Sequence, residues 1–266
     1  MKQPIHALLK LSTGLSLLLG GFTQAANNWT PAEIPTHLWF DGADASTITH
    51  SSNAVTQWRD KSGNDRNANA SGGNSPQFVS NALNGKSLLR FDGSDDRMEF
   101  PGGFVPGDFV ALFKRSANNQ SVIESGTGTN RGWVGMWDHT WSSHNRYSTN
   151  GFGLSTFFPD GAHGSDYFMV YGSDTRWTGG LSTNSGQNFI GRGTPGYQNL
   201  NGDLAEFVVF TSVLPEADRD RVHGYLAHKW GLTSIIPGGN PYKTTAPLAS
   251  TKACLLYTSP SPRDPT

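Results

Sequence analysis

The stretch that most constrains the fold covers residues 201–230, which predict one buried strand followed by one amphipathic helix. Side chains of a strand point alternately to two faces. Strict alternation gives each face three apolar residues, with Glu206 as the only charge: Ala205, Phe207 and Val209 on one face, and Leu204, Val208 and Phe210 on the other. A strand that is apolar on both faces needs a sheet around it and a layer over it, so the stretch predicts a β-sandwich.

The helix is expected to pack on this sandwich through one face. Five residues fall on that face at helical spacing: Val222, Tyr225, Leu226, Lys229 and Trp230. Pro215 fits the first helical position, and Gly231 followed by Leu232 fits the end of the helix. His223 and His228 are five residues apart, which puts them on different faces and excludes a metal clamp of the i, i+4 kind.

Both ends of the chain are expected to lie outside the folded domain. Residues 1–25 predict a signal peptide, because two lysines flank the start, residues 11–21 are apolar or small, and small residues end the stretch. We therefore expect a secreted, periplasmic or cell-surface protein. Residues 254–264 are identical to one reading frame of a transposon-end sequencing adapter, so we interpret 254–266 as an artefact. The expected organisation is a lead over 26–35, one domain over 36–243, and the start of a linker to further domains over 244–253.

Composition excludes several classes of function. Cys254, the only cysteine, lies in the tail, which leaves no disulfide, thiolate metal site or cysteine nucleophile in the domain. Without Lys2, Lys10, Arg263 and Asp264 the chain keeps 17 basic and 20 acidic residues. A net charge of about −3 argues against nucleic acid or an anionic membrane as partner. No apolar run after the signal peptide approaches the length of a transmembrane span.

Glycine and proline are abundant, with 32 and 15 residues, and predict short strands joined by many turns. Besides the strand at 204–210, extended stretches are predicted at 36–41, 55–60, 76–79, 87–91, 97–100, 109–114, 121–124, 167–171 and 189–192. Trp58, Met98 and Phe100 are expected in the core. Asn84 followed by Gly85 predicts a tight hairpin. Strand edges between residues 126 and 164 cannot be assigned.

Several strings resemble one known family. They are Leu38-Trp39-Phe40-Asp41 with residues 43–48, then 58–64, 83–86, 90–96 and 202–206, and the closing strings 222–232 and 240–243. Together they are similar to bacterial secreted laminin-G-like domains of the concanavalin A-like lectin/glucanase superfamily. The resemblance implies an all-β fold, a two-sheet antiparallel jelly-roll sandwich with one C-terminal helix. It also implies glycan or protein binding, frequent use of calcium, and no catalytic residues. Residues 102–193 show no such resemblance.

A possible calcium site lies in one tight turn. Asp92, Asp95 and Asp96 offer the carboxylate oxygens that calcium binds, and Asn201 and Asp203 are expected to join them from a neighbouring turn. The alternative is ordinary turn chemistry, in which these side chains bond to their own backbone. No other cofactor is expected.

The best candidate ligand site is an aromatic and polar stretch in the irregular middle of the chain. Its residues are Trp137, Asp138, His139, Trp141, His144, Asn145, Arg146 and Tyr147, extended on another loop by Arg176 and Trp177. Sugar rings stack on exposed aromatic faces while the polar groups bind hydroxyls. The alternative is that the tryptophans are core residues, which we favour for Trp133. A zinc site from His139, His144 and His163 with Asp138, Asp160 and Asp166 matches no established spacing.

Motifs for catalysis are absent from the sequence. The paired acids of sandwich glucanases, E-x-D-x-E on one strand, do not occur, and Glu206 is expected to pair with an arginine such as Arg90 or Arg192. The sequence therefore predicts a non-enzymatic extracellular module that binds a glycan or an extracellular protein, with calcium as the possible cofactor. Two alternatives stay open: a polysaccharide hydrolase or lyase of the same fold, and a structural adhesin or spacer module.

Overall fold

A computed structural model describes residues 28–103, 107–116, 120–125, 132–135, 153–158, 167–173, 187–192 and 199–250. Within them the chain is mostly β, with one α-helix, α1 (Glu216–Trp230), and three short 3-10 helices, η1 (Pro31–Glu33), η2 (Ala45–Thr47) and η3 (Thr233–Ile235). The strands are β1 (Thr36–Asp41), β2 (Ile48–Ser51), β3 (Ala54–Trp58), β4 (Ala68–Asn69), β5 (Gln77–Leu83), β6 (Lys86–Asp92), β7 (Met98–Pro101), β8 (Phe109–Arg115), β9 (Ser121–Ser125), β10 (Gly132–Gly135), β11 (Gly153–Phe158), β12 (Phe168–Ser173), β13 (Gln187–Ile190) and β14 (Asn201–Phe210).

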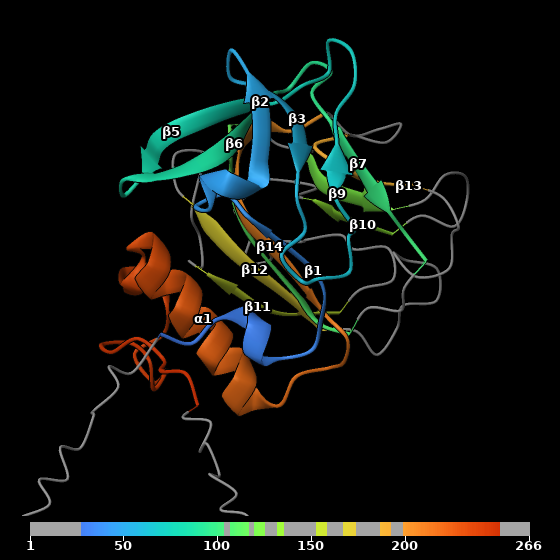
Figure 1. Cartoon of the computed structure of the whole chain (residues 1–266). Helices are drawn as coiled ribbons and strands as arrows, with labels where there is room; N and C mark the ends of the chain where they lie inside the picture. The colour runs from blue at the N-terminus through green and yellow to red at the C-terminus, as the bar shows by residue number, and fades with distance from the viewer. Residues whose placement is uncertain are drawn as a thin grey trace, which may run out of the picture.

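The strands of these residues are hydrogen-bonded into one antiparallel sheet that curls on itself (Figure 1). Its order is β10-β9-β13-β7-β4-β3-β5-β6-β14-β8-β12-β11, with β1 also paired to β14 and β2 to β3. β14 is central, because its first half pairs with β6 and its second half with β1, while β8 follows it on the other side. The predicted antiparallel β fold with one helix is confirmed. Its description as a two-sheet jelly roll stays a prediction.

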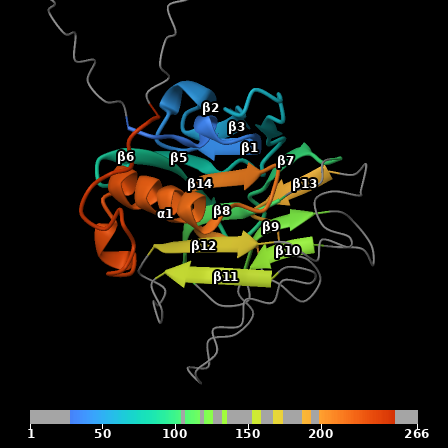
Figure 2. The ribbon, with the colours of Figure 1, turned by 90° about the horizontal axis from the view of Figure 1, so that it is seen from below.

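Apolar side chains cover both faces of the sheet, as the strand at 204–210 predicted. One cluster fills the inside of the curl and includes Phe40, Trp58, Phe91, Met98 and Phe100. The other cluster lies between the opposite face and the helix, and joins Val110 and Val208 of the sheet to Val222 and Leu226 of α1. Figure 2 shows α1 lying across the part of the sheet made by β14, β8 and β12. Each fully buried apolar side chain stabilises the fold by about 1.5–3 kcal/mol, so this face fixes the helix in place.

β14 carries a bulge that sequence alternation did not predict. Its register against β8 shifts between Leu204 and Glu206. As a result Leu204 lies with Phe207 and Val209 in the inner cluster, whereas Ala205 lies with Val208 and Phe210 under the helix. The expected faces of residues 204 and 205 were therefore wrong, because a bulge inserts one extra residue and changes the phase of alternation.

The two ends of α1 differ, because only the C-terminal end has a capping motif. Pro215 lies just before the helix instead of at its first position, with an extended ψ of 153°. Gly231 ends the helix in the left-handed region at φ 69°, and Leu232 N donates to the Ala227 carbonyl oxygen at 2.7 Å. The predicted end is confirmed. Glycine is needed here because other residues avoid this conformation.

The β5–β6 hairpin turn packs against that helix end. Asn84 and Gly85 have φ values of 47° and 78°, the two positive angles that a tight hairpin requires, so the predicted turn is confirmed. The Asn84 amide donates to the carbonyl oxygen of Trp230. A methyl group on Gly231 would lie 2.6 Å from Asn84 Nδ2. The turn therefore satisfies one of the helix's terminal carbonyls.

The segments that flank the predicted domain belong to the folded part. Trp29 is 1% exposed and packs edge-on against Tyr225, with ring centroids 5.8 Å apart. Its amide donates to Pro247 O at 2.9 Å, and Asn28 pairs with Leu248 as an antiparallel bridge. Burial of Trp29 therefore holds the described residues 28–35 and 244–250 on the fold, while the division into a lead over 26–35 and a linker over 244–253 stays a prediction. In this described part of the chain, α1 is neither long nor apolar enough to cross a membrane.

Candidate functional site

The acidic turn, defined as Asp92, Asp95 and Asp96 between β6 and β7, forms as predicted. One carboxylate oxygen from each residue lies within 4.8 Å of the others. Much of the turn is held by its own backbone: Asp92 Oδ1 accepts from Ser94 N at 2.7 Å, and Asp96 Oδ2 accepts from Asp92 N at 2.9 Å. The geometry is therefore that of an Asx-type turn whose oxygens also fit the donor set of a calcium ion.

Within the acidic turn, the pKa values of Asp92 and Asp96 are shifted in opposite directions. The backbone N–H of Ser94 holds the pKa of Asp92 below its ordinary value. Burial raises the pKa of Asp96 to about 6, and the charges of Asp92 and Asp95 add to the rise. Like charges so close together disfavour each other's ionised forms, and a cation would remove that repulsion.

Asn201 and Asp203, the two residues expected to complete the metal site, differ in what their side chains contact. Asn201 lies opposite Asp92 in the β14–β6 pairing, and its side chain packs so closely on Gly93 that a methyl there would be 2.7 Å from Asn201 Cβ. Asp203 is not part of the acidic group. Its Oδ1 accepts from Arg90 Nε at 2.7 Å and its Oδ2 from Tyr167 OH at 2.8 Å. Arg90, directly opposite Asp203 in register, takes its carboxylate, so the role of Asp203 in a metal site stays a prediction.

The predicted ligand loop cannot be placed. Its residues Trp137, Asp138, His139, Trp141, His144, Asn145, Arg146 and Tyr147, with Arg176 and Trp177, lie outside the described residues. The histidines and aspartates of the zinc hypothesis, including His163, Asp160 and Asp166, also lie outside them. The backbone of Trp133 is in β10.

A hollow of about 270 Å³ opens on the helix-covered face of the sheet, at the ends of β6, β8 and β14. We call it the outer hollow; it is lined by Arg90, Lys114, Arg115, Ser116, Asn201, Gly202 and Asp203. Arg90 shares its face with Leu88, and Lys114 with Leu112, since both pairs are two residues apart on one strand. The hollow therefore continues the face that α1 covers further along.

Four polar residues form one cross-strand row at the outer hollow. Asp203 is paired in register with Arg90 on one side and Lys114 on the other, and Tyr167 precedes β12 beside Lys114. The row alternates in charge: the buried Asp203 carboxylate binds Arg90 through two nitrogens, at 2.7 and 3.0 Å, and Lys114 Nζ lies 5.9 Å from the centroid of the Tyr167 ring. Burial raises the pKa of Tyr167, as does the charge of Asp203, so its hydroxyl remains a donor.

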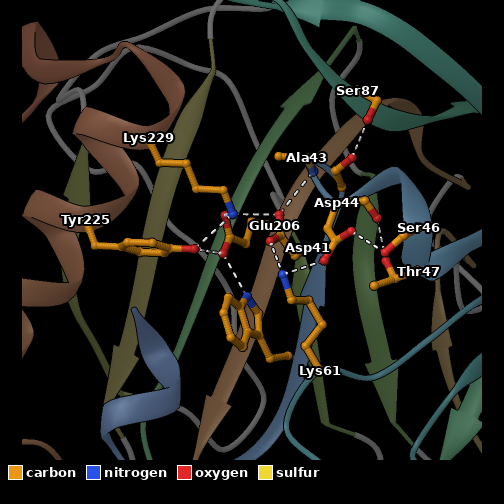
Figure 3. A network of polar contacts seen from close by, with 12 residues as sticks. Asp41, Ala43, Asp44, Ser46, Thr47, Lys61, Ser87, Glu206, Tyr225 and Lys229 are labelled. Carbon is orange, nitrogen blue, oxygen red and sulfur yellow. Dashed lines mark hydrogen bonds and ion pairs between the residues drawn. The ribbon is translucent and has the colours of Figure 1, made fainter. Parts of the chain in front are cut away.

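A second polar group, the buried ion cluster, joins the helix to the sheet (Figure 3). It consists of Asp41, Lys61, Glu206, Tyr225 and Lys229. Lys229 Nζ lies 2.7 Å from Glu206 Oε2 and 2.5 Å from Asp41 Oδ1, and Lys61 Nζ lies 2.8 Å from Asp41 Oδ2. Lys61 Nζ also lies 2.8 Å from Asp44 Oδ2 at the edge of the cluster, so every buried carboxylate here faces an ammonium group.

Glu206 is completely enclosed by donors in this cluster. Its side chain is 0% exposed and accepts from Trp39 Nε1 at 2.8 Å, Tyr225 OH at 2.9 Å and Trp230 Nε1 at 2.7 Å, besides Lys229. The expected pairing with Arg90 or Arg192 was wrong. Glu206 lies on the helix-covered face with Val208 and Phe210, where Lys229 of α1 reaches its carboxylate. We interpret the cluster as structural, since each of these polar atoms already has a protein partner.

The charges of the cluster stabilise one another. Burial alone would lower the pKa of Lys61, but hydrogen bonds and charges of Asp41 and Asp44 outweigh it and raise that pKa. The hydrogen bond from Lys61 also lowers the pKa of Asp44, with help from Ser46. Burial raises the pKa of Tyr225 well above 10.

Beside the cluster, a hollow of about 370 Å³ lies between α1 and the two terminal segments, lined in part by Trp29, Tyr225 and His228.

Sequence reasoning missed Arg90, Lys114 and Tyr167 as members of one site. Each stands at a polar position of an otherwise apolar strand or beside one, which is a weak signal. Only the pairing order β6-β14-β8-β12 brings them together. Comparison of the chain with models of known protein families, with curated proteins and with solved structures finds no match.

Proposed function

We propose that this chain is an extracellular, non-catalytic module that binds carbohydrate, built as a jelly-roll sandwich of the concanavalin A-like kind. The observation that carries the proposal is the outer hollow, whose lining offers guanidinium, ammonium, hydroxyl and amide groups in about 270 Å³. A sugar presents many hydroxyl groups in a small volume, and each needs a donor or an acceptor. The polar side chains that line this hollow can supply such groups.

Rigidity of the scaffold supports this proposal. The residues of the hollow stand on β6, β8 and β14, which pair with one another in the middle of the sheet. Asp203 is 3% exposed and fixes Arg90 by two hydrogen bonds. Groups held in this way lose little conformational entropy when a ligand binds, so weak polar contacts can add up to measurable affinity.

Calcium is part of the proposal through Asn201, which links the acidic turn to the hollow. This residue lines the hollow and packs on Gly93 of the turn. Its carbonyl oxygen accepts from Ser116 N at 2.7 Å and from Ser116 Oγ at 2.9 Å. A cation bound by Asp92, Asp95 and Asp96 would fix the turn, and with it one wall of the hollow.

The predicted aromatic loop is retained as a second contact surface. Trp137 and Trp141 are proposed to stack on sugar rings, which would add about 1 kcal/mol or more for each ring that is covered. Double replacement of both by Ala is expected to abolish glycan binding and to leave the melting temperature nearly unchanged. A large loss of stability would instead identify them as core residues.

A glycan array tests the proposal. The secreted chain is applied to immobilised neutral and acidic polysaccharides, once with millimolar calcium and once with chelator. We expect binding to a subset of glycans, with a stronger signal in calcium. Absence of signal in both conditions would contradict the proposal and favour a structural spacer. Release of reducing sugar from any bound polysaccharide would contradict the non-catalytic part and favour a hydrolase of the same fold.

A further inference from the structure

We propose that the outer hollow selects polysaccharides that carry an anionic group, either a uronate carboxylate or a sulfate ester. This inference rests on the proposed function and specifies its ligand. The hollow is lined by three cationic residues, Arg90, Lys114 and the 5% exposed Arg115, and by a single carboxylate, Asp203. The excess of positive charge in a chain with more acidic than basic residues is a local property of this face.

Asp203 does not repel an anionic ligand, because the guanidinium group of Arg90 already compensates its negative charge. Its two oxygens accept three hydrogen bonds, two from Arg90 at 2.7 and 3.0 Å and one from Tyr167 at 2.8 Å. Its side chain is 4% exposed, whereas that of Arg90 is 51% exposed. The carboxylate therefore lies below the surface and positions the guanidinium, whose remaining edge faces the hollow.

Lys114 provides the second cation. Its ammonium group lies over the ring of Tyr167 at 5.9 Å from the centroid, and within the described part of the chain it forms no salt bridge. It stands one strand away from Asp203 in the same cross-strand row, on the side opposite Arg90. An anionic group placed between Arg90 and Lys114 would receive charge-assisted hydrogen bonds from both, and these are about twice as strong as neutral ones.

The neighbouring groups suit a sugar better than an isolated anion. Ser116 and Asn201 line the same hollow and offer a hydroxyl and an amide beside the two cations. A nucleic acid, in contrast, needs a series of cations that follows its phosphates. The size and charge of this hollow fit one acidic sugar unit of a polymer.

Binding of three defined polymers tests the inference: polygalacturonate, dextran sulfate and neutral dextran. We expect the protein to bind at least one acidic polymer more tightly than dextran, and the Lys114→Gln variant to lose about tenfold in that affinity. Polygalacturonate and dextran sulfate distinguish carboxylate from sulfate. Binding should also weaken as sodium chloride is raised, because salt screens exposed charges.

Arg221→Gln is the matched control, since it removes one positive charge from α1, away from the hollow. Thermal unfolding checks that both variants keep the fold. Equal affinity of wild type, Lys114→Gln and Arg221→Gln for acidic polymers would overturn the inference and leave carbohydrate binding intact. A preference for neutral dextran would also overturn the inference and leave carbohydrate binding intact. Failure to bind any polysaccharide, here and on the array, would overturn the proposed function as well.

Discussion

Lys229 Nζ lies 2.7 Å from Glu206 Oε2, which ties the last turn of α1 to the middle of β14. The Glu206 side chain is 0% exposed and that of Lys229 15%, so the pair is removed from water. We expect Lys229→Met to lower the free energy of unfolding by about 3–5 kcal/mol, because it leaves Glu206 and Asp41 with one cation fewer. Urea denaturation at pH 7 measures this change.

The control for this prediction is Arg221→Met. Arg221 pairs with Asp218 on the same helix at 2.9 Å, but the two side chains are 32% and 29% exposed. Such a pair contributes about 0–1 kcal/mol, so its loss should change stability little. Similar losses for the two variants would mean that burial adds nothing to the pair in the cluster.

Gly231→Ala is expected to destabilise the protein more than Gly72→Ala. Both glycines have a left-handed backbone, with φ 69° and 67°. A methyl on Gly72 meets nothing within 4 Å, whereas one on Gly231 would lie 2.6 Å from Asn84 Nδ2. The Gly72 variant should cost about 1 kcal/mol for the conformation alone, and the Gly231 variant more, because the hairpin turn must move.

Thermal unfolding of the two variants separates conformational strain from the steric effect. Asn84→Ala provides a third comparison, since it removes both the clash and the hydrogen bond to Trp230 O. In the Asn84→Ala background the extra cost at Gly231 should shrink. An unchanged cost would show that the hairpin does not restrict this position.

His223 makes stability depend on pH. It is 3% exposed, and burial lowers its pKa to about 4, with a contribution from the charge of Arg219. An unfolded histidine has a pKa of about 6.5, so between these values the unfolded chain binds a proton that the folded chain does not. This contribution to stability is fully present above about pH 6.5 and is lost as pH falls toward 4, by about 3 kcal/mol in total.

Denaturation of wild type and His223→Gln at several pH values between 7 and 4 measures this effect. The difference between their free energies of unfolding should shrink as pH falls. The difference is needed because Asp96 acts in the opposite direction. Its folded pKa of about 6 exceeds the ordinary 3.8, so its protonation stabilises the fold as pH falls. His50→Gln, at an exposed position, should follow wild type. A parallel course of all three proteins would contradict the prediction.

Calcium is expected to raise the melting temperature through the acidic turn. The Asp95→Asn variant should lose most of this increase, because it removes one of three close carboxylates and part of their mutual repulsion. Calorimetric titration with calcium gives the affinity directly. Asp65→Asn changes an exposed acid of another loop and should respond to calcium as wild type does. An equal response of all three proteins would place any calcium elsewhere.

The sequence predicted much of the sheet because apolar alternation reports burial. Residues 55–60 and 97–100 carry that pattern, and most of each stretch lies in β3 and in β7. β2 was missed because its sequence is mostly polar and exposed after Ile48, and β4 because it has only two residues. The order of strands could not be predicted, since register depends on contacts between distant parts of the chain.

The candidate site, like the sheet, could be predicted where its residues are close in sequence, and not where distant parts of the chain meet. The acidic turn is local in sequence, so Asp92, Asp95 and Asp96 could be identified from their spacing. The row of Arg90, Asp203 and Lys114 joins residues from three strands that are distant in sequence, and no local pattern announces it. The partner of Glu206 was missed because Lys229 belongs to α1, and which helix residue reaches a strand position depends on how the helix packs on the sheet.

Mechanical force applied through the two ends of the fold would act first on the bridge between Asn28 and Leu248. The two flanking segments lie side by side and antiparallel at this bridge, so tension applied through them would break the bridge first. It would next extract Trp29 from its place beside Tyr225, before any load reached the pairing of β1 with β14. Low forces are therefore expected to detach the two ends first and to leave the sheet, with its outer hollow, assembled.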